Sequence, residues 1–166
     1  MSSLRGLATL AFVAVLAGCG FQLRGDAPMG LKSIHVSTDG NSAVATEVRR
    51  RLAGGPTQLA PTIKDAEAHL RITSETQEKA ILTLTGTGRV YEYQLRLRVD
   101  YQVNDASAKA LVEPTQIEVR RNLTYSDTAP LAKEAEEVQL YVDMRQDAAA
   151  IILRRIAIAS GGGPAR

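Results

Sequence analysis

The clearest pattern in the chain is a strict alternation of apolar and polar residues between positions 91 and 103. The apolar side chains occupy every second position: Tyr91, Tyr93, Leu95, Leu97, Val99, Tyr101 and Val103. Polar residues such as Glu92, Arg96 and Asp100 stand between them. A period of two over this length is typical of an antiparallel strand with one buried face and one face in water.

Shorter stretches of the same kind predict further strands. Residues 31–37 and 68–74 alternate, and residues 81–84 either continue the second of these strands or begin another. A Gly-Thr-Gly sequence then predicts a turn before the long strand. A last strand is expected over residues 117–125, where Arg121 interrupts the apolar side.

A first helix is predicted between the first two strands. Val44, Val48 and Leu52 recur at helical spacing after a run of Asp, Gly, Asn and Ser that offers several N-caps, and Gly-Gly-Pro at 54–56 ends the helix. Three arginines at 49–51 lie in its last turn, where positive charge suits the helix dipole. Their side chains either lie in water at the end of the helix or form a patch that binds lipid phosphates.

A second, long helix is predicted over residues 131–159. Its broad apolar face comprises Val138, Tyr141, Val142, Ala148, Ala149, Ile152, Leu153 and Ile156. A narrower stripe nearly opposite comprises Leu140, Met144, Ile151 and Ile158. A surface helix needs one apolar face. The second stripe therefore indicates either a helix wedged inside its own domain or a contact surface for a partner.

Together these elements predict an α+β fold in a single small domain over residues 31–160. The expected element order is β-α-β-β-β-α, with a mostly antiparallel sheet of about four strands and both helices packed on one face. The glycine-rich tail at 161–166 is expected to be disordered.

The N-terminus has the pattern of a lipoprotein leader. Arg5 precedes an uncharged apolar run at 7–17, which is shorter than the roughly 20 residues needed to span a bilayer. Leu-Ala-Gly-Cys at 16–19 matches the bacterial lipobox, in which the cysteine is acylated and the leader is cut before it. We therefore expect removal of residues 1–18, N-acyl and S-diacylglycerol groups (palmitate among the acyl chains) on Cys19, and a tether over 19–30. Gly20 after the cysteine favours sorting to the outer membrane.

Composition narrows the function. The formal net charge of +2 falls to +1 when the leader removes Arg5, and tryptophan is absent, which argues against a nucleic-acid binder. Two histidines and one cysteine, already expected to be acylated, make no metal constellation, and no Gly-x-Ser-x-Gly elbow occurs. We expect no enzymatic activity and no cofactor apart from the covalent lipid.

Four arginines stand on the polar faces of predicted strands: Arg71, Arg96, Arg98 and Arg120. Guanidinium groups suit phosphate by their bidentate geometry. If the strands are neighbours, these residues form a basic patch on the open sheet face; otherwise they are solvated arginines beside acidic neighbours.

Three segments resemble the LptE family of lipopolysaccharide-assembly lipoproteins: 19–25 (Cys-Gly-Phe-Gln-Leu-Arg-Gly), 92–99 (Glu-Tyr-Gln-Leu-Arg-Leu-Arg-Val) and 129–156, which includes Leu-Ala-Lys-Glu at 131–134. The resemblance implies a small sheet with two helices on one face, plugging the lumen of the outer-membrane barrel LptD. It also implies contact with lipopolysaccharide through basic residues near the hairpin tip and ahead of the last helix, here Arg89 and Lys133.

The function expected is therefore an outer-membrane, lipid-anchored subunit that plugs and helps assemble an LptD-like barrel and helps deliver lipopolysaccharide. The alternative is a lipopolysaccharide- or lipid-binding lipoprotein without an obligate barrel. The candidate lipopolysaccharide ligands are Lys133, Arg89, Arg96, Arg98 and Arg120. The candidate partner contacts are Leu140, Met144, Ile151 and Ile158. No nucleic acid is expected among the partners.

Overall fold

The computed structural model describes residues 29–126 and 128–162. The leader at 1–18, the lipidation site Cys19 and nearly all of the expected tether lie outside the described residues. The elements, in chain order, are β1 (Ser33–Thr38), α2 (Ala43–Ala53), β2 (Gln58–Leu59), the 3-10 turn η1 (Ile63–Asp65), β3 (Ala68–Leu84), β4 (Val90–Asp105), β5 (Ala110–Thr124) and α3 (Pro130–Ala159).

The strands form one mixed sheet in the order β2-β1-β3-β4-β5. β1 runs parallel to both β2 and β3, whereas β3, β4 and β5 form an antiparallel meander. The α+β class and the order β-α-β-β-β-α are confirmed. The fifth strand is β2, whose two residues are too few to produce a period in the sequence.

β3 is a single strand of 17 residues, so the stretch at 81–84 continues the strand that begins at Ala68. Its register with β4 shifts between Ile72 and Ser74 and again beyond Ile81. A bulge adds one residue to a strand, so the residues after it point to the face opposite to the one that strict alternation would give them. Glu75 therefore lies opposite the buried Val99, on the face that carries the helices.

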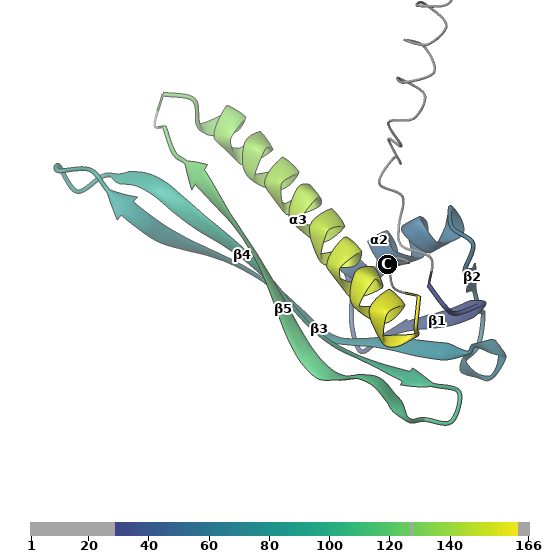
Figure 1. The fold of residues 1–166 in the computed structure, drawn as a ribbon. Coiled ribbons are helices and arrows are strands. Elements are labelled where there is room, and N and C mark those ends of the chain that lie inside the picture. Colours follow the sequence, from purple (N-terminus) through teal and green to yellow (C-terminus); the bar gives the residue numbers. More distant parts are fainter. Residues whose placement is uncertain (1–28, 127, 163–166) are drawn as a thin grey trace, which may run out of the picture.

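Both helices cover the same face of the sheet, as Figure 1 shows. α3 packs on β5 and β4 and also contacts α2. The inward side chains of four strands and both helices form one core, and the long alternating strand supplies the largest share of its strand residues. Those from β4 are Leu95, Leu97, Val99, Tyr101 and Val103.

The start of α2 is fixed by two side chains. The Ser42 hydroxyl accepts a hydrogen bond from the Ala45 amide at 2.9 Å, as an N-cap does. The carboxylate of Glu75 accepts from the Val44 amide at 3.0 Å and from the Ser42 hydroxyl at 2.6 Å. The bulge in β3 is what brings Glu75 to this helix end, where a negative charge also suits the helix dipole.

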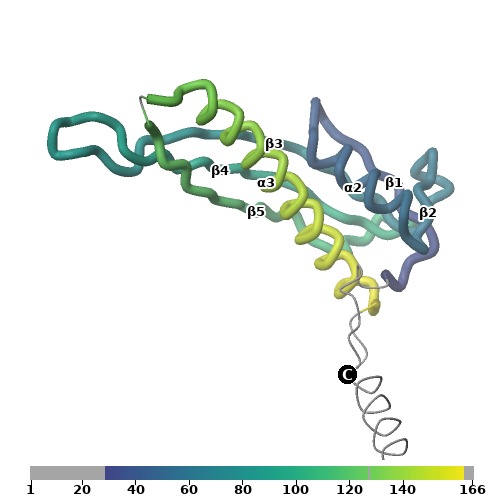
Figure 2. Tube along the Cα trace, turned by 90° about the horizontal axis from the view of Figure 1, so that it is seen from above, coloured from purple at the N-terminus to yellow at the C-terminus, as the bar shows by residue number. Residues whose placement is uncertain are grey.

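The β3–β4 hairpin extends well beyond the layer of helices. Figures 1 and 2 show its tip projecting from the sheet at the same end of the molecule as the start of α3. We call residues 79–93 of this hairpin the distal arm and the remainder of the described chain the body. Between residues 79 and 93 no residue is buried, and the last paired residue of β5 lies opposite Glu92.

Candidate functional site: the open sheet face and the distal arm

The structure brings three of the predicted arginines together on the sheet face opposite the helices. Arg96 and Arg120 are directly paired across β4 and β5, and Arg98 is paired with Glu118. Arg71, in contrast, lies further along β3 and makes a bidentate ion pair with Asp39, at 2.8 and 2.9 Å. The predicted patch therefore consists of Arg96, Arg98 and Arg120.

Carboxylates balance most of this patch. Glu118 bonds to Arg98 at 2.7 Å and also to Arg120, and Glu78 bonds to Arg98 at 2.7 Å. The hydrogen bonds from Arg98 and Arg120 lower the pKa of Glu118. The hydrogen bond to Glu118 and the charge of Glu78 in turn raise the pKa of Arg98. Glu118 thus stays ionised and holds two guanidinium groups in place.

Arg96 differs from its neighbours because its guanidinium bonds to the neutral amide of Gln94, at 2.7 Å. It also faces the like charge of Arg120 across the strands, an arrangement that is unfavourable for an antiparallel pair. An anion placed between the two side chains would relieve this repulsion. Within the patch, Arg96 and Arg120 are therefore the residues best placed to take a phosphate group.

Arg89 and Lys133 lie at the distal end of the molecule, in two different elements. Arg89 is in the turn of the β3–β4 hairpin, where its amide donates to the Thr85 hydroxyl at 3.1 Å. Lys133 is in the first turn of α3, and its ammonium group pairs with Glu136 at 2.8 Å. Arg89 lies near the hairpin tip, whereas Lys133 lies within the last helix rather than ahead of it, and contact of either residue with lipopolysaccharide stays a prediction.

The second apolar stripe of α3 is not a continuous surface. Met144 is fully buried and Leu140 packs partly against the core, because α3 contacts α2 as well as the sheet. The interpretation of a helix wedged inside its own domain is therefore correct for these two residues, and Met144 offers no surface to a partner. Ile151 and Ile158 remain exposed, at 36% and 62%. Their role as contacts stays a prediction.

The broad apolar face of α3 is also buried only in part. Val138 belongs to it by spacing but is 63% exposed, and Leu131 at the start of the helix is 79% exposed. These turns of α3 extend toward the distal arm, beyond the widest part of the sheet (Figure 1). The spacing of apolar residues cannot show where along a helix its supporting layer ends.

The distal arm exposes apolar side chains that the periodicity assigned to ordinary strands. Ile81, Leu82, Leu84 and Tyr91 are each about half exposed, between 45% and 57%. Ile81 pairs with Tyr93 of β4, and the register shifts at Leu82, which has no partner residue on β4. Several exposed apolar groups on one projecting hairpin are typical of a segment that another molecule covers.

Polar contacts join the arm and the adjoining residue Glu78 to α3, and no local sequence pattern indicated them. Lys79 pairs with Glu137 at 2.5 Å and lies over the Tyr93 ring, 4.4 Å from its centroid. The Tyr141 hydroxyl donates to the backbone carbonyl of Glu78 at 2.9 Å. These residues meet because the long hairpin returns beneath the last helix, a contact between segments about sixty residues apart.

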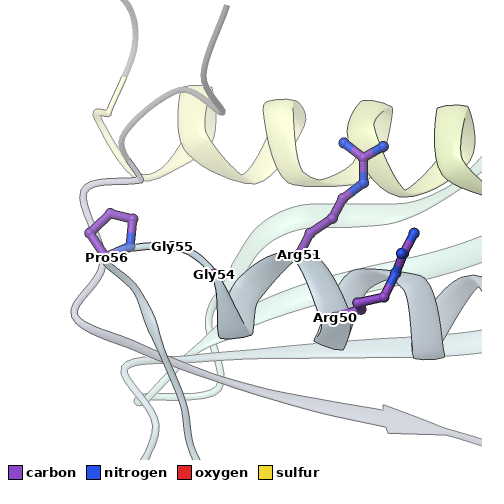
Figure 3. A pocket seen from close by; sticks show the side chains of 5 residues that line it. All are labelled: Arg50, Arg51, Gly54, Gly55 and Pro56. Carbon is purple, nitrogen blue, oxygen red and sulfur yellow. The ribbon is translucent and has the colours of Figure 1, made fainter.

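The arginine run at the end of α2 borders a shallow depression of about 450 Å³. Its lining consists of Arg50, Arg51 and residues 54–56, and Figure 3 shows Arg51 projecting from α2 toward α3. Arg50 and Arg51 both bind the carboxylate of Glu47, at 2.6 and 3.2 Å. Arg49 donates to the carbonyl of Val36 at 3.0 Å.

The histidines lie side by side on β1 and β3, on the sheet face away from the helices. Their ring centroids are 5.5 Å apart, and His69 Nε2 lies 2.7 Å from the Ser37 hydroxyl. Burial, His35 and Arg71 together lower the pKa of His69. Within the described part of the chain no three potential metal ligands cluster, and no helix is long and apolar enough to cross a bilayer.

Comparison with known proteins identifies relatives of this chain by sequence. The family model described as "LptE: Lipopolysaccharide-assembly" matches residues 31–156. An LPS-assembly lipoprotein LptE from Photorhabdus laumondii is 30% identical over 94% of this chain and 84% of its own length, and one from Yersinia enterocolitica is 31% identical over 93% and 74%.

Solved structures agree with these sequence matches. The solution structure of lipoprotein B from Nitrosomonas europaea superposes with a TM-score of 0.75 at 30% identity, over 87% of this chain and 94% of that one. The rare lipoprotein B of Shewanella oneidensis gives a TM-score of 0.67, also at 30% identity, over 76% of this chain and 94% of that one. The protein therefore belongs to the LptE family of lipopolysaccharide-assembly lipoproteins.

Proposed function

We propose that the chain is anchored in the outer membrane through lipid on Cys19 and plugs an LptD-like β-barrel, which it helps to assemble and through which it helps to deliver lipopolysaccharide. The match to the lipopolysaccharide-assembly family across residues 31–156 carries this proposal. The distal arm supports it, because a projecting hairpin with several exposed apolar groups suits insertion into a partner.

The polar exterior of the body is consistent with a plug. The open sheet face carries ion pairs and amides, such as Arg98 with Glu118 and Gln116 with Asp100, which suit a water-filled lumen. The partner contacts in this proposal are the apolar groups of the arm together with Ile151 and Ile158. The body itself supplies a rigid scaffold behind them.

Lipopolysaccharide contact is proposed at two places. Arg96 and Arg120 offer a pair of cations, of which Arg96 bonds to the neutral amide of Gln94, and Arg98 is held beside them by Glu78 and Glu118. Arg89 and Lys133 lie at the distal end, near the exposed apolar groups. Lipid A combines phosphates with acyl chains, so basic and apolar groups at one end of the molecule form a suitable ligand surface.

Co-purification tests the barrel partnership. The lipidated chain, extracted from membranes in detergent, should bring down a large β-barrel protein in stable complex. Leu82→Asp in the arm should release most of that protein, because a charge would enter an apolar interface. Leu59→Asp changes an apolar residue of similar exposure in the body and should retain it. A wild-type chain recovered alone would reject the proposal.

Lipopolysaccharide titration separates the plug from the alternative of a stand-alone binding lipoprotein. The pure chain should lose affinity in the Lys133→Ala variant and in a combined Arg96→Gln/Arg120→Gln variant. Unchanged binding in both variants would remove these residues from the ligand surface. Tight binding by a chain that never co-purifies with a barrel would favour the stand-alone function.

The anchor has a direct test. Cys19→Ala should abolish incorporation of labelled palmitate and release the chain from the membrane fraction. Recovery of the variant in acylated form would contradict the assignment of Cys19.

A further inference from the structure

Charge is distributed unevenly along the layer of helices. Residues 130–147 of α3 hold five acidic and two basic side chains, whereas residues 148–159 hold two arginines and no acidic residue. α2 holds three arginines and one glutamate. The helices lie side by side with both C-terminal ends at the same end of the molecule, away from the hairpin tip (Figures 1 and 2). We call Arg49, Arg50, Arg51, Arg154 and Arg155 the basic helix end.

The internal partners of these arginines leave much of their charge in solvent. Glu47 is the carboxylate that Arg50 and Arg51 share, and the Arg50 side chain stays 67% exposed. Arg155 lies 3.4 Å from the hydroxyl of Tyr101, a neutral partner. Arg154 is exposed on the last turns of α3. The helix dipole favours cations at a C-terminus, and the exposed guanidinium groups of Arg50 and Arg154 are accessible to an outside anion.

The described chain begins beside this same end. Met29 packs against the core, and Gly30 lies so close to the end of α3 that a Cβ on it would come within 2.4 Å of the Ser160 carbonyl oxygen. Met29 is ten positions after Cys19 in the sequence. Even a fully extended segment of that length reaches only about 35 Å. A lipid on Cys19 therefore keeps the basic helix end close to a bilayer surface.

We propose that the basic helix end docks on an anionic phospholipid surface, with Arg50 and Arg154 as its most accessible contacts. The guanidinium groups bind headgroup phosphates by bidentate hydrogen bonds. The depression beside residues 54–56, about 450 Å³ in volume, gives a headgroup room next to Arg50 and Arg51.

The location of this surface rests on the proposed lipid anchor, but the binding itself needs neither the anchor nor the barrel. Each basic residue near an anionic membrane strengthens binding about fivefold, so two of them account for about 30-fold. The attraction weakens as salt shortens the Debye length, to about 3 Å at 1 M. The interaction is therefore weak alone and effective once a tether holds the surfaces together.

Vesicle co-sedimentation tests the proposal. The mature chain from residue 19, carrying Cys19→Ala, is mixed with vesicles of phosphatidylethanolamine and phosphatidylglycerol or with vesicles of phosphatidylcholine alone. Arg50→Gln/Arg154→Gln removes two exposed charges from the basic helix end. Arg71→Gln/Arg145→Gln removes the same charge from the open sheet face and the acidic half of α3. Arg50→Lys/Arg154→Lys preserves charge, and a circular dichroism spectrum checks that each variant folds.

We expect binding to the anionic vesicles only, about 30-fold weaker in Arg50→Gln/Arg154→Gln, nearly unchanged in Arg71→Gln/Arg145→Gln, and lost in about 1 M salt. The lysine variant should fall between these two, because it keeps the charge but loses the bidentate hydrogen bonds. Absence of binding to anionic vesicles overturns the proposal. Equal losses in the two glutamine variants also overturn it, because net charge rather than this surface would then govern binding. Failure here leaves the barrel partnership standing, and a chain without a barrel partner can still bind the vesicles.

Discussion

The body and the distal arm belong to the same strands but are stabilised differently. In the body, β3 and β4 are covered by two helices, and residues such as Leu70 and Leu97 are fully buried. In the arm, the same two strands continue past the contact of Lys79 with α3, and Ile81 and Leu84 are half exposed. A two-stranded ribbon is marginally stable in water. The comparison indicates that the body folds by itself, whereas the arm keeps apolar surface for another molecule.

The largest predicted contrast is between apolar truncations in the two regions. Leu97→Ala removes a fully buried side chain from β4 and should lower the free energy of unfolding by about 2–5 kcal/mol. Leu82→Ala in the arm should lower it by less than about 1 kcal/mol, because the side chain is already half in water. Urea denaturation of the free chain measures both, and equal losses would erase the distinction.

A smaller loss of stability is expected when the N-cap of helix α2 in the body is removed. Ser42→Ala removes the N-cap of α2 and the hydrogen bond to Glu75, and should cost about 1–2 kcal/mol. Thr46→Ala, in the first turn of the same helix and exposed, serves as the control. A stability loss no greater than that of the control would mean that Glu75 alone holds the helix end.

The link between the two regions should be weaker still. Tyr141→Phe removes the hydrogen bond from α3 to the Glu78 carbonyl and should cost about 0.5–1 kcal/mol in global stability. Hydrogen exchange should quicken in residues 79–84 of the arm while the amides of the body keep their protection. Faster exchange spread evenly over the whole sheet would show that the arm and the body open as one unit.

The smallest predicted effect is a pH dependence confined to the body. The pKa of His69 is lowered in the folded chain, chiefly by burial, with His35 and Arg71 adding repulsion. The unfolded chain therefore takes up this proton first, and stability present at pH 7 falls as the pH drops below about 6.5. Urea midpoints between pH 7.5 and about 5.5 should decline in the wild type and decline less in His69→Gln. A steeper decline in the variant would contradict this sign.

Local patterns predicted the body well because in the body the apolar face of each strand and helix packs against the opposite layer. The alternation at 91–103 became β4, and the spacing of Val44, Val48 and Leu52 became α2. Arg121, which interrupts the apolar side of β5, is explained by its ion pair with Asp147 of α3. That partner is distant in sequence, so the spacing of residues within the strand gave no sign of it.

The candidate site was predicted less completely. Sequence placed Arg96, Arg98 and Arg120 on one face, but the carboxylates that balance them belong to two neighbouring strands and depend on register. Met144 was expected at a partner surface because periodicity does not show that α2 covers that side of α3. The exposure of the arm depends on where the helix layer ends, which no local pattern records.

In-cell photo-crosslinking tests most directly whether the arm, rather than the body, binds the partner. A photoreactive amino acid is placed at Leu82 in the arm or at Leu59, a position of similar exposure in the body. Leu82 should crosslink efficiently to a large outer-membrane β-barrel protein, and Leu59 should yield far less of that product. Crosslinking from Leu59 alone, or no barrel product from Leu82, would contradict the assignment of the distal arm as the partner-binding region.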